Sequence, residues 1–334
     1  MSASGLPFDD IRTLCRMLPP PDGEAMATAR ARNAALAKPA GSLGRLETIA
    51  EWVAGWQGNA LPQVMRPLAA LFAASHGVAA HLPPPKIDAA ERLAQAAAGG
   101  AAINQVCATH DIGLKVFELA LQHPTHDITV AAALEERDCT ATIAFGMEAI
   151  AGGADLLCLG EIASGSDIAV AAMLSALLGG EPAQWLEEAD PALKAHQADL
   201  AGRALTRNAG QLGDPLEVLR RLGGREIAAA TGAILAARIQ RIPVVLDSLA
   251  VAAAGAVLYS LDPGALDHCL AGHSAGPVHA RALARLGLTP VLDLDVTLGE
   301  GVGAAMAAGI IRAALACHAG MAKAEAPPRP PVLN

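Results

Sequence analysis

The sequence predicts an α/β protein with a doubly wound, mostly parallel, Rossmann-like sheet of about six strands. Short apolar runs alternate with helical segments along most of the 334 residues. Continuous apolar runs are typical of strands covered on both faces, and strands separated by helices favour a parallel sheet. The runs expected to form strands are residues 67–75, 114–121, 154–159, 243–246, 266–270 and 291–296.

Composition narrows the class of ligand. Hydrophobic residues make up 53% of the chain but aromatic residues only 2%, so the core must be built from Ala, Leu, Val and Ile. The 24 Lys and Arg residues are outnumbered by 33 Asp and Glu residues, which gives a net charge of −9. Because the chain has no basic stripe and almost no aromatic stacking platform, we do not expect it to bind nucleic acid.

Cysteine usage and hydropathy indicate a cytoplasmic protein. The six cysteines are scattered, with no C-x-x-C pair and no metal-ligand spacing, so we expect reduced thiols and no metal site. The N-terminus carries Asp9 and Asp10 and no long apolar run, which argues against a signal peptide. The apolar run after Ser248 is too short to span a membrane, and Arg312 interrupts the last one, so no membrane segment is expected.

The two ends of the chain differ from the alternating middle. Residues 1–60 have an amphipathic helical pattern with a proline-rich break at 19–21. Residues 38–47 form a loop whose basic pair, Lys38 and Arg45, is expected to be solvated, and Ser42 could open the helix that follows. The prolines of residues 324–334 cannot join a helix or a sheet interior, so this tail is expected to be disordered.

Polar residues follow the predicted strands, and parallel strands place their carboxyl ends at one edge of the sheet. Helix N-termini point at the same edge and favour an anion. We therefore expect a site for a negatively charged small molecule there. The residues that converge are Ser75, His76, residues 161–167, Asp247, Ser248, His273, Ser274 and Glu300.

Several common motifs are absent, which leaves two carboxylates as the sharpest candidates. The sequence has no Walker A loop and no G-x-G-x-x-G at the first helix. The histidines beside strand ends, His76, His273 and His279, are more often structural than catalytic. Glu161 and Glu300 each follow a strand run through a glycine, and two carboxylates in different surroundings can divide base and electrostatic roles. Alternatively, Glu300 merely caps the following helix.

Four motifs in sequence resemble the nicotinate-nucleotide–dimethylbenzimidazole phosphoribosyltransferase family. The resemblance extends over most of the chain, from about residue 38 to residue 322. The motifs are K-P-A-G-S-L-G-R-L-E at 38–47, G-G-A-A-I-N at 99–104, G-D-P-L-E-V-L at 213–219 with G-G-R-E-I-A at 223–228, and L-G-E-G-V-G-A-A at 298–305.

The resemblance implies phosphoribosyl transfer from nicotinate mononucleotide to 5,6-dimethylbenzimidazole, giving the α-ribazole 5′-phosphate of the cobalamin lower loop. It implies Glu300 as general base, no cofactor, and a homodimer. It also implies a helical domain from residues 1–60 with 306–334, beside a Rossmann-like domain at 61–305. Together with the sheet edge, it assigns Glu161 to catalysis and these residues to substrate binding: Ser75, His76, Gly99, Gly100, Asn104, Gly160, Ser164, Gly165, Lys194, Asp247, Ser274, Leu298 and Gly299.

Both substrate loops depart from the family pattern. The phosphate-side motif G-E-M-G-I-G-N-T-T reads G-E-I-A-S-G-S-D-I at 160–168, with Ala163 for a glycine and Asp167 near the phosphate. The benzimidazole-pocket glutamine is displaced by prolines at 83–85, S-A-E-P-G-H becomes S-A-G-P-V-H at 274–279, and Lys194 is an approximate stand-in for the family lysine. The alternatives are a changed base or nucleotide preference, or a non-catalytic paralogue that binds such a ligand or a partner subunit.

Overall fold

The predicted α/β class is confirmed. A computed structural model describes residues 7–84 and 88–324. Its six-stranded sheet has the order β2-β1-β3-β4-β5-β6, and every neighbouring pair is parallel. The expected disorder of residues 324–334 falls, apart from Ala324, outside the described residues. The strands are β1 (Pro67–Ser75), β2 (Gly113–Glu118), β3 (Leu156–Ser164), β4 (Val244–Leu246), β5 (Cys269–Ser274) and β6 (Pro290–Asp293).

The order of the strands reverses between β1 and β3. From β1 the chain passes to β2 on one side, then returns to place β3 to β6 in succession on the other side. β1 and β3 stay paired along their full length, up to Ser75 beside Ser164. Parallel α/β sheets usually bind ligands outside the carboxyl ends of the strands at such a reversal. The topology therefore favours a ligand site beside the ends of β1 and β3.

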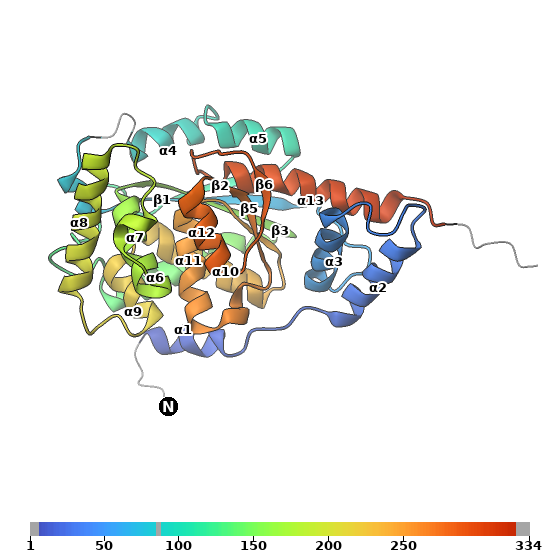
Figure 1. The fold of residues 1–334 in the computed structure, drawn as a ribbon, viewed down its shortest axis with the longest axis horizontal. Helices are drawn as coiled ribbons and strands as arrows, with labels where there is room; N and C mark the ends of the chain where they lie inside the picture. Colours follow the sequence, from blue (N-terminus) through green and yellow to red (C-terminus); the bar gives the residue numbers. More distant parts are fainter. Residues whose placement is uncertain (1–6, 85–87, 325–334) are drawn as a thin grey trace, which may run out of the picture. The chain divides into compact units, whose positions relative to one another are not determined.

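Helices cover both faces of the sheet, with α4 and α5 on one side and α6, α10 and α11 on the other (Figure 1). α4 packs against β1, β2 and β3, whereas α10 packs against β1 and β3. The α-helices are α1 (Phe8–Cys15), α2 (Gly23–Ala35), α3 (Arg45–Gln57), α4 (Ala89–Ala97), α5 (Ala102–His110), α6 (Glu136–Met147), α7 (Ser166–Leu178), α8 (Pro191–Arg207), α9 (Pro215–Leu222), α10 (Arg225–Ile239), α11 (Leu249–Leu261), α12 (Pro277–Arg285) and α13 (Val302–Gly320). Short 3₁₀ turns occupy Gly77–His81, Glu148–Ile150, Pro182–Trp185 and Pro263–Leu266.

Some strand boundaries differ from the prediction, and the difference in β3 matters for the site. The segment after Leu159 was expected to leave the sheet, but β3 continues to Ser164. It does so because each residue of the extension pairs with β1, including Glu161 with Phe72. β5 begins at Cys269 rather than 266, since Pro263–Leu266 forms a 3₁₀ turn. Glu161 is thus held by the sheet rather than by a loop.

The chain divides into two compact units. Unit 1 comprises residues 1–19 and 65–308 and contains the sheet, and unit 2 comprises residues 20–64 and 309–334. α1 belongs to unit 1 and packs against α6 and α11. The boundary predicted from the sequence, with residues 1–60 and 306–334 against 61–305, stays a proposal about functional domains.

Unit 2 holds the loop that was expected to be solvated. The Lys38 side chain is only 5% exposed, and its Nζ donates to Glu47 Oε1 at 2.8 Å. The expectation of a solvated lysine is therefore wrong, because Glu47, in the first turn of α3, provides a local counterion. In the same unit, His318 Nδ1 lies 2.7 Å from Asn33 Oδ1, so α13 and α2 are joined by a buried polar contact.

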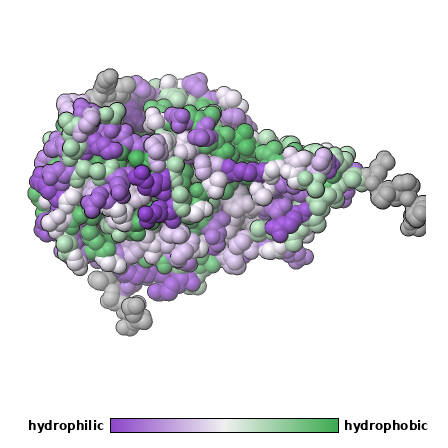
Figure 2. All heavy atoms as spheres, in the orientation of Figure 1, coloured by the Kyte–Doolittle hydropathy of each residue, from purple (hydrophilic) through white to green (hydrophobic). Residues whose placement is uncertain are grey.

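One described helix, α13, is long and apolar enough to cross a membrane by length and composition alone. However, 56% of its apolar window is buried inside the protein, as in a core helix. On the face shown in Figure 2, hydrophilic side chains cover much of the surface and apolar ones gather over α13. All six cysteines are free, and all but Cys317 are buried.

Candidate active site

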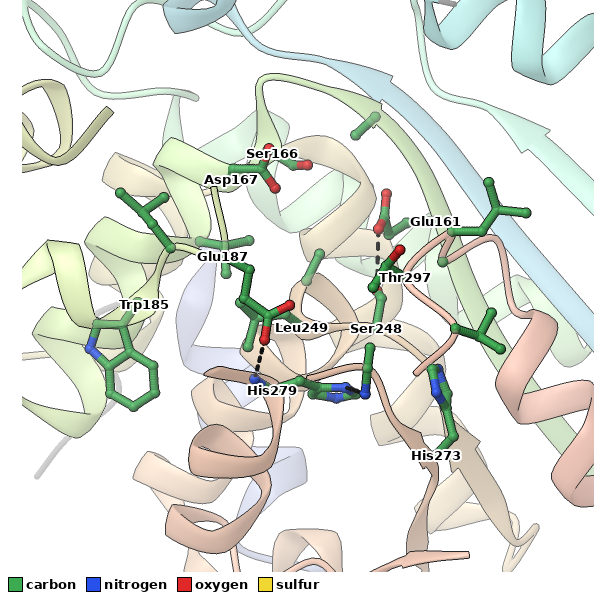
Figure 3. Close-up of a pocket in the computed structure, with 18 of the residues that line it drawn as sticks. Glu161, Ser166, Asp167, Trp185, Glu187, Ser248, Leu249, His273, His279 and Thr297 are labelled. Carbon is green, nitrogen blue, oxygen red and sulfur yellow. Dashed lines mark hydrogen bonds between the residues drawn. The ribbon is translucent and has the colours of Figure 1, made fainter. Parts of the chain in front are cut away.

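A cavity of about 300 Å³ opens at the carboxyl edge of the sheet, within unit 1 (Figure 3). We call it the inner cavity. Its wall combines the ends of β3 and β5 with the segments that follow β4 and β6. The lining residues are Arg92, Glu161, Ala163, Ser166, Asp167, Val170, Trp185, Leu186, Glu187, Ser248, Leu249, Ala250, His273, Ala275, His279, Val296, Thr297, Leu298 and Gly299.

Glu161 faces the inner cavity from β3. Burial, and after it the negative charge of Glu226, raise the pKa of the Glu161 carboxyl to about 7. Ser248 Oγ, at the start of α11, donates to Glu161 Oε1 at 3.2 Å (Figure 3). The backbone of the 298–301 turn passes close by, since a Cβ on Gly299 would lie 3.6 Å from Glu161 Oε1. Glu161 is therefore a carboxyl group with a pKa near neutral pH, and it lies next to the turn that carries Glu300.

Glu300 stands in a left-handed turn before α13. Its φ is +60°, between Gly299 at +71° and Gly301 at +77°. A non-glycine residue in this region costs free energy and persists where surrounding contacts hold it. Here Arg92 of α4 supplies those contacts: its Nε donates to Glu300 Oε1 at 2.7 Å and its Nη2 to the Leu298 carbonyl at 3.1 Å. Glu300 is only 4% exposed, and it lies immediately behind the cavity wall formed by Leu298 and Gly299.

Asp247 accounts for the capping role that was an alternative for Glu300. Its two carboxylate oxygens accept the N–H groups of Gly301, at 2.8 Å, and Ala304, at 2.9 Å. These are donors at the start of α13, where a carboxylate is favourable. His273 Nε2 lies 3.3 Å from Asp247 Oδ1. Burial opposes the charged imidazole, but this contact outweighs it and raises the pKa of His273. Asp247 therefore holds the backbone N–H groups at the end of the turn that carries Glu300.

His76 and Glu226 form a second buried pair behind Glu161. His76 Nε2 and Glu226 Oε1 are 2.7 Å apart, and both side chains are almost fully buried. Burial disfavours the charged imidazole, but the Glu226 carboxylate outweighs it and raises the pKa of His76. His76 does not line the inner cavity. The contact that the structure shows for its side chain is the one with the buried Glu226 carboxylate.

The remaining predicted residues divide into two groups. Leu298 and Gly299 line the inner cavity, and Lys194 lines a second, more open cavity of about 420 Å³, which we call the outer cavity. The others contact protein groups. For example, Asn104 accepts from the Ala101 N–H and donates to the Ala96 carbonyl, which joins α4 to α5. The residues that line neither cavity are Ser75, His76, Gly99, Gly100, Asn104, Gly160, Ser164, Gly165, Asp247, Ser274 and Glu300.

Three lining residues had no signal in the sequence reasoning. Arg92 is one basic residue in an alanine-rich helix, and its role depends on α4 lying against the 298–301 turn. Glu187 and Trp185 belong to the segment between α7 and α8, which carries none of the motifs named above. A contact between a charged side chain on one helix and a turn far away in the sequence cannot be predicted from either segment alone.

Asp167, the acidic residue that the sequence placed near the substrate phosphate, lies in the wall of the inner cavity. Removal from water raises the pKa of its carboxyl, although the His76 charge opposes this. Among the described residues that line the inner cavity, Arg92 is the sole Lys or Arg, against three carboxylates, Glu161, Asp167 and Glu187. Among residues 7–84 and 88–324, no group of three or more His, Cys, Asp and Glu side chains could hold a metal ion.

The comparisons give first the class and then the family. A family model described as phosphoribosyltransferase matches residues 18–327. The nicotinate-nucleotide–dimethylbenzimidazole phosphoribosyltransferases of Rhizobium etli and Sinorhizobium fredii are 56% and 55% identical to this chain, each over 96% of it and 97% of the relative. The crystal structure of the Thermus thermophilus protein of that name matches with a TM-score of 0.83 and 33% identity, over 90% of this chain and 97% of that one. The chain belongs to the nicotinate-nucleotide–dimethylbenzimidazole phosphoribosyltransferase family.

Proposed function

We propose that the protein transfers the phosphoribosyl group of nicotinate mononucleotide to 5,6-dimethylbenzimidazole. The products are α-ribazole 5′-phosphate and nicotinate, and the former enters the lower nucleotide loop of cobalamin. The observation that carries this proposal is the Glu300 turn, which sits beside a cavity with a second carboxylate, Glu161, in a chain similar to such enzymes over nearly its full length. The comparisons give no support to a non-catalytic paralogue.

Glu300 is the general base in this proposal. The benzimidazole N–H proton passes to the Glu300 carboxylate, and the other ring nitrogen attacks the anomeric carbon of the ribose. The bond from that carbon to the pyridinium nitrogen breaks, and its electron pair stays on the departing nicotinate. Attack and departure occur on opposite faces, so the anomer inverts from β to α. A positioned base of this kind contributes about 10²–10⁴-fold in rate.

Glu161 supports the transition state rather than the proton transfer. Positive charge develops at the anomeric carbon as the pyridinium bond weakens, and a nearby carboxylate stabilises it in a site removed from bulk water. The pKa of about 7 means that a small fall in pH removes this negative charge. Ser248, which donates to Glu161, keeps the carboxylate aimed at the cavity.

The other assigned residues have supporting parts in the proposal. Leu298 and Gly299 contact the acceptor side of the inner cavity, and Lys194 lies on the phosphate side, in the outer cavity. The residues behind the wall hold the turns that shape it. We further propose that the protein works in the cytoplasm, as its cysteine usage and hydropathy indicate. We also propose that it forms a homodimer, as the family resemblance implies. Sedimentation equilibrium of the purified protein tests the dimer, and a monomer at micromolar concentration would contradict it.

The direct test of the reaction is product identification. Purified protein is incubated with nicotinate mononucleotide and 5,6-dimethylbenzimidazole, and the nucleotide product is isolated and its anomeric configuration assigned by NMR. We expect equal amounts of nicotinate and the α-anomer. A β-anomer would contradict the inverting mechanism, and substrate binding without any product would contradict the function and favour a binding protein.

A further inference from the structure

One glutamate stands on the border between the two cavities. Glu187 lines both the inner and the outer cavity. Its Oε1 accepts the backbone N–H of Val278 at 2.8 Å. It also accepts that of His279 at 3.2 Å, the bond drawn in Figure 3. These are donors in the first turn of α12, where the helix dipole also favours an anion. Glu187 therefore occupies, with a carboxylate of the protein itself, a position suited to an anion.

The local backbone is built for close approach at this position. Gly276 adopts φ +129°, and a Cβ placed on it would lie 2.7 Å from Glu187 Oε1. Pro277 follows and carries no N–H, so Val278 and His279 offer the first donors of the helix. A side chain at 276 would push an oxygen atom away from these donors. The contact thus depends on glycine at one position and proline at the next.

His279 provides an independent sign of a missing acceptor. Its side chain lines the inner cavity and is 1% exposed, and burial lowers its pKa to about 4, so the ring is neutral near pH 7. The Ala275 N–H donates to its Nδ1 at 3.2 Å, which leaves the proton on Nε2. This Nε2–H has no hydrogen-bond partner among the described residues. A buried donor without an acceptor is costly, and a ligand oxygen would satisfy it.

Two basic residues lie at different ends of the two cavities, one beside Glu300 and the other beside Glu187. Arg92 holds Glu300 behind the part of the inner-cavity wall that Leu298 and Gly299 form, whereas Lys194 lines the outer cavity beside Glu187 and Pro277. The proposed donor carries a phosphate with strong acceptor oxygens at the end opposite its pyridine ring. The α12 first turn, the His279 Nε2–H and the Lys194 side chain are donors that suit such a group.

We infer that Glu187 is a specificity-determining residue that takes the place of the donor's phosphate before the donor binds and is displaced when it does. This inference rests on the proposed function. The Glu187 carboxylate competes with the phosphate for the same N–H groups, so it weakens donor binding. It also disfavours phosphate-free anions too weak to replace it.

The test compares Glu187→Gln with Glu188→Gln as a matched control. Glu188 also lines the outer cavity, but its carboxylate accepts from the Asp190 N–H, not from α12. Both changes remove one negative charge, whereas only the first weakens the competitor. A glutamine at 187 can still accept the two N–H bonds, so the fold should be kept. Equal melting temperatures of the three proteins check this.

Steady-state kinetics with saturating dimethylbenzimidazole gives the first readout. We expect Glu187→Gln to lower KM for nicotinate mononucleotide by about two- to thirtyfold, the range for one charge at a helix N-terminus, with kcat changed by less than about twofold. Glu188→Gln removes a charge from the same cavity but no contact with α12, so it should lower KM by less than Glu187→Gln does. A higher KM in Glu187→Gln would overturn the inference, because the carboxylate would then contact the substrate. Equal falls in both variants would also overturn it, as a general charge effect.

A second readout does not require turnover. Calorimetric titration with ribose 5-phosphate reports phosphate binding whether or not the protein makes product. Tighter binding by Glu187→Gln than by the unaltered protein and Glu188→Gln supports the inference even if the proposed reaction fails. Identical affinities in all three proteins overturn it even if the reaction succeeds.

Discussion

At the scale of single residues, Glu161 is expected to dominate the pH dependence. Its carboxyl has a pKa of about 7, raised above the usual range for glutamate. It is therefore neutral below that pH and ionised above it. In the proposed mechanism the ionised form stabilises the charge that develops on the ribose, so kcat should rise with pH through a midpoint near 7.

The matching experiment is a pH–rate profile of the unaltered protein and of Glu161→Gln. The variant should have a lower kcat, by about 10–10³-fold as for removal of one electrostatic group, and should lack the limb near pH 7. A limb that persists at the same midpoint in the variant would assign that titration to another group and contradict this role.

The histidines show what residue-level reasoning can and cannot predict. His76 and His273 were expected to be structural more often than catalytic, and the structure gives each a buried carboxylate partner, Glu226 and Asp247. Neither partner could be paired with its histidine from sequence spacing, because the residues of the first pair lie 150 positions apart. Only the fold brings them together.

At the scale of elements, the contact between β3 and the 298–301 turn should be sensitive to one methyl group. A Cβ on Gly160 would lie 2.1 Å from the Gly301 nitrogen, so the turn must shift to make room. We expect Gly160→Ala to cost about 1–3 kcal/mol of unfolding free energy and to lower kcat because Glu300 moves with the turn.

Gly213→Ala is the control for that change, since a Cβ there has nothing within 4 Å. It should alter the unfolding free energy by less than about 0.5 kcal/mol. Denaturant unfolding measures both variants. Unchanged stability and activity in Gly160→Ala would show that the backbone contact is looser than the structure places it.

Helix α4 is tied to the same turn by Arg92. Its guanidinium holds both the Glu300 carboxylate and the Leu298 carbonyl. Arg92→Met removes both bonds and should lower kcat strongly with little change in donor KM. Arg92→Lys restores one charged donor and should recover part of kcat, because a lysine cannot make the two-point contact.

Chemical rescue separates positioning from folding in Arg92→Met. Added guanidinium ion at millimolar concentration should raise kcat if the loss comes from the missing group at the turn. Loss of donor binding instead, seen as a raised KM with kcat preserved, would mean that Arg92 contacts the donor rather than positioning the base.

At the scale of the whole molecule, the sheet was predictable because its central strands, β1, β3, β4 and β5, are largely buried. Six continuous apolar runs gave six parallel strands, and the polar residues after them meet at one edge. The end of β3 was not predictable, since a glycine and a glutamate read as a loop until their pairing with β1 is seen. The local sequence pattern does not predict which strand a segment will pair with.

The positions of the two carboxylates near one edge of the sheet were predictable from the sequence, whereas several of their neighbours were not. The two carboxylates were identified from their glycine settings, and the acidic replacement at Asp167 was visible in the sequence. Arg92 and Glu187 were missed because each acts on a segment remote in the chain, at 298–300 and at 278–279. Whether a motif glycine such as Gly160 touches substrate or backbone also depends on packing, which a motif alone does not show.

The most direct test of the central claim is a comparison of the unaltered protein with Glu300→Gln. Turnover of nicotinate mononucleotide and 5,6-dimethylbenzimidazole is followed by nicotinate release, and the affinity of both ligands is measured by calorimetry. A general base predicts that kcat falls by about 10²–10⁴-fold while ligand affinities stay within a few-fold. Turnover that survives the change would contradict the assignment of Glu300 as the base, and with it the interpretation of the 298–301 turn as the centre of the site.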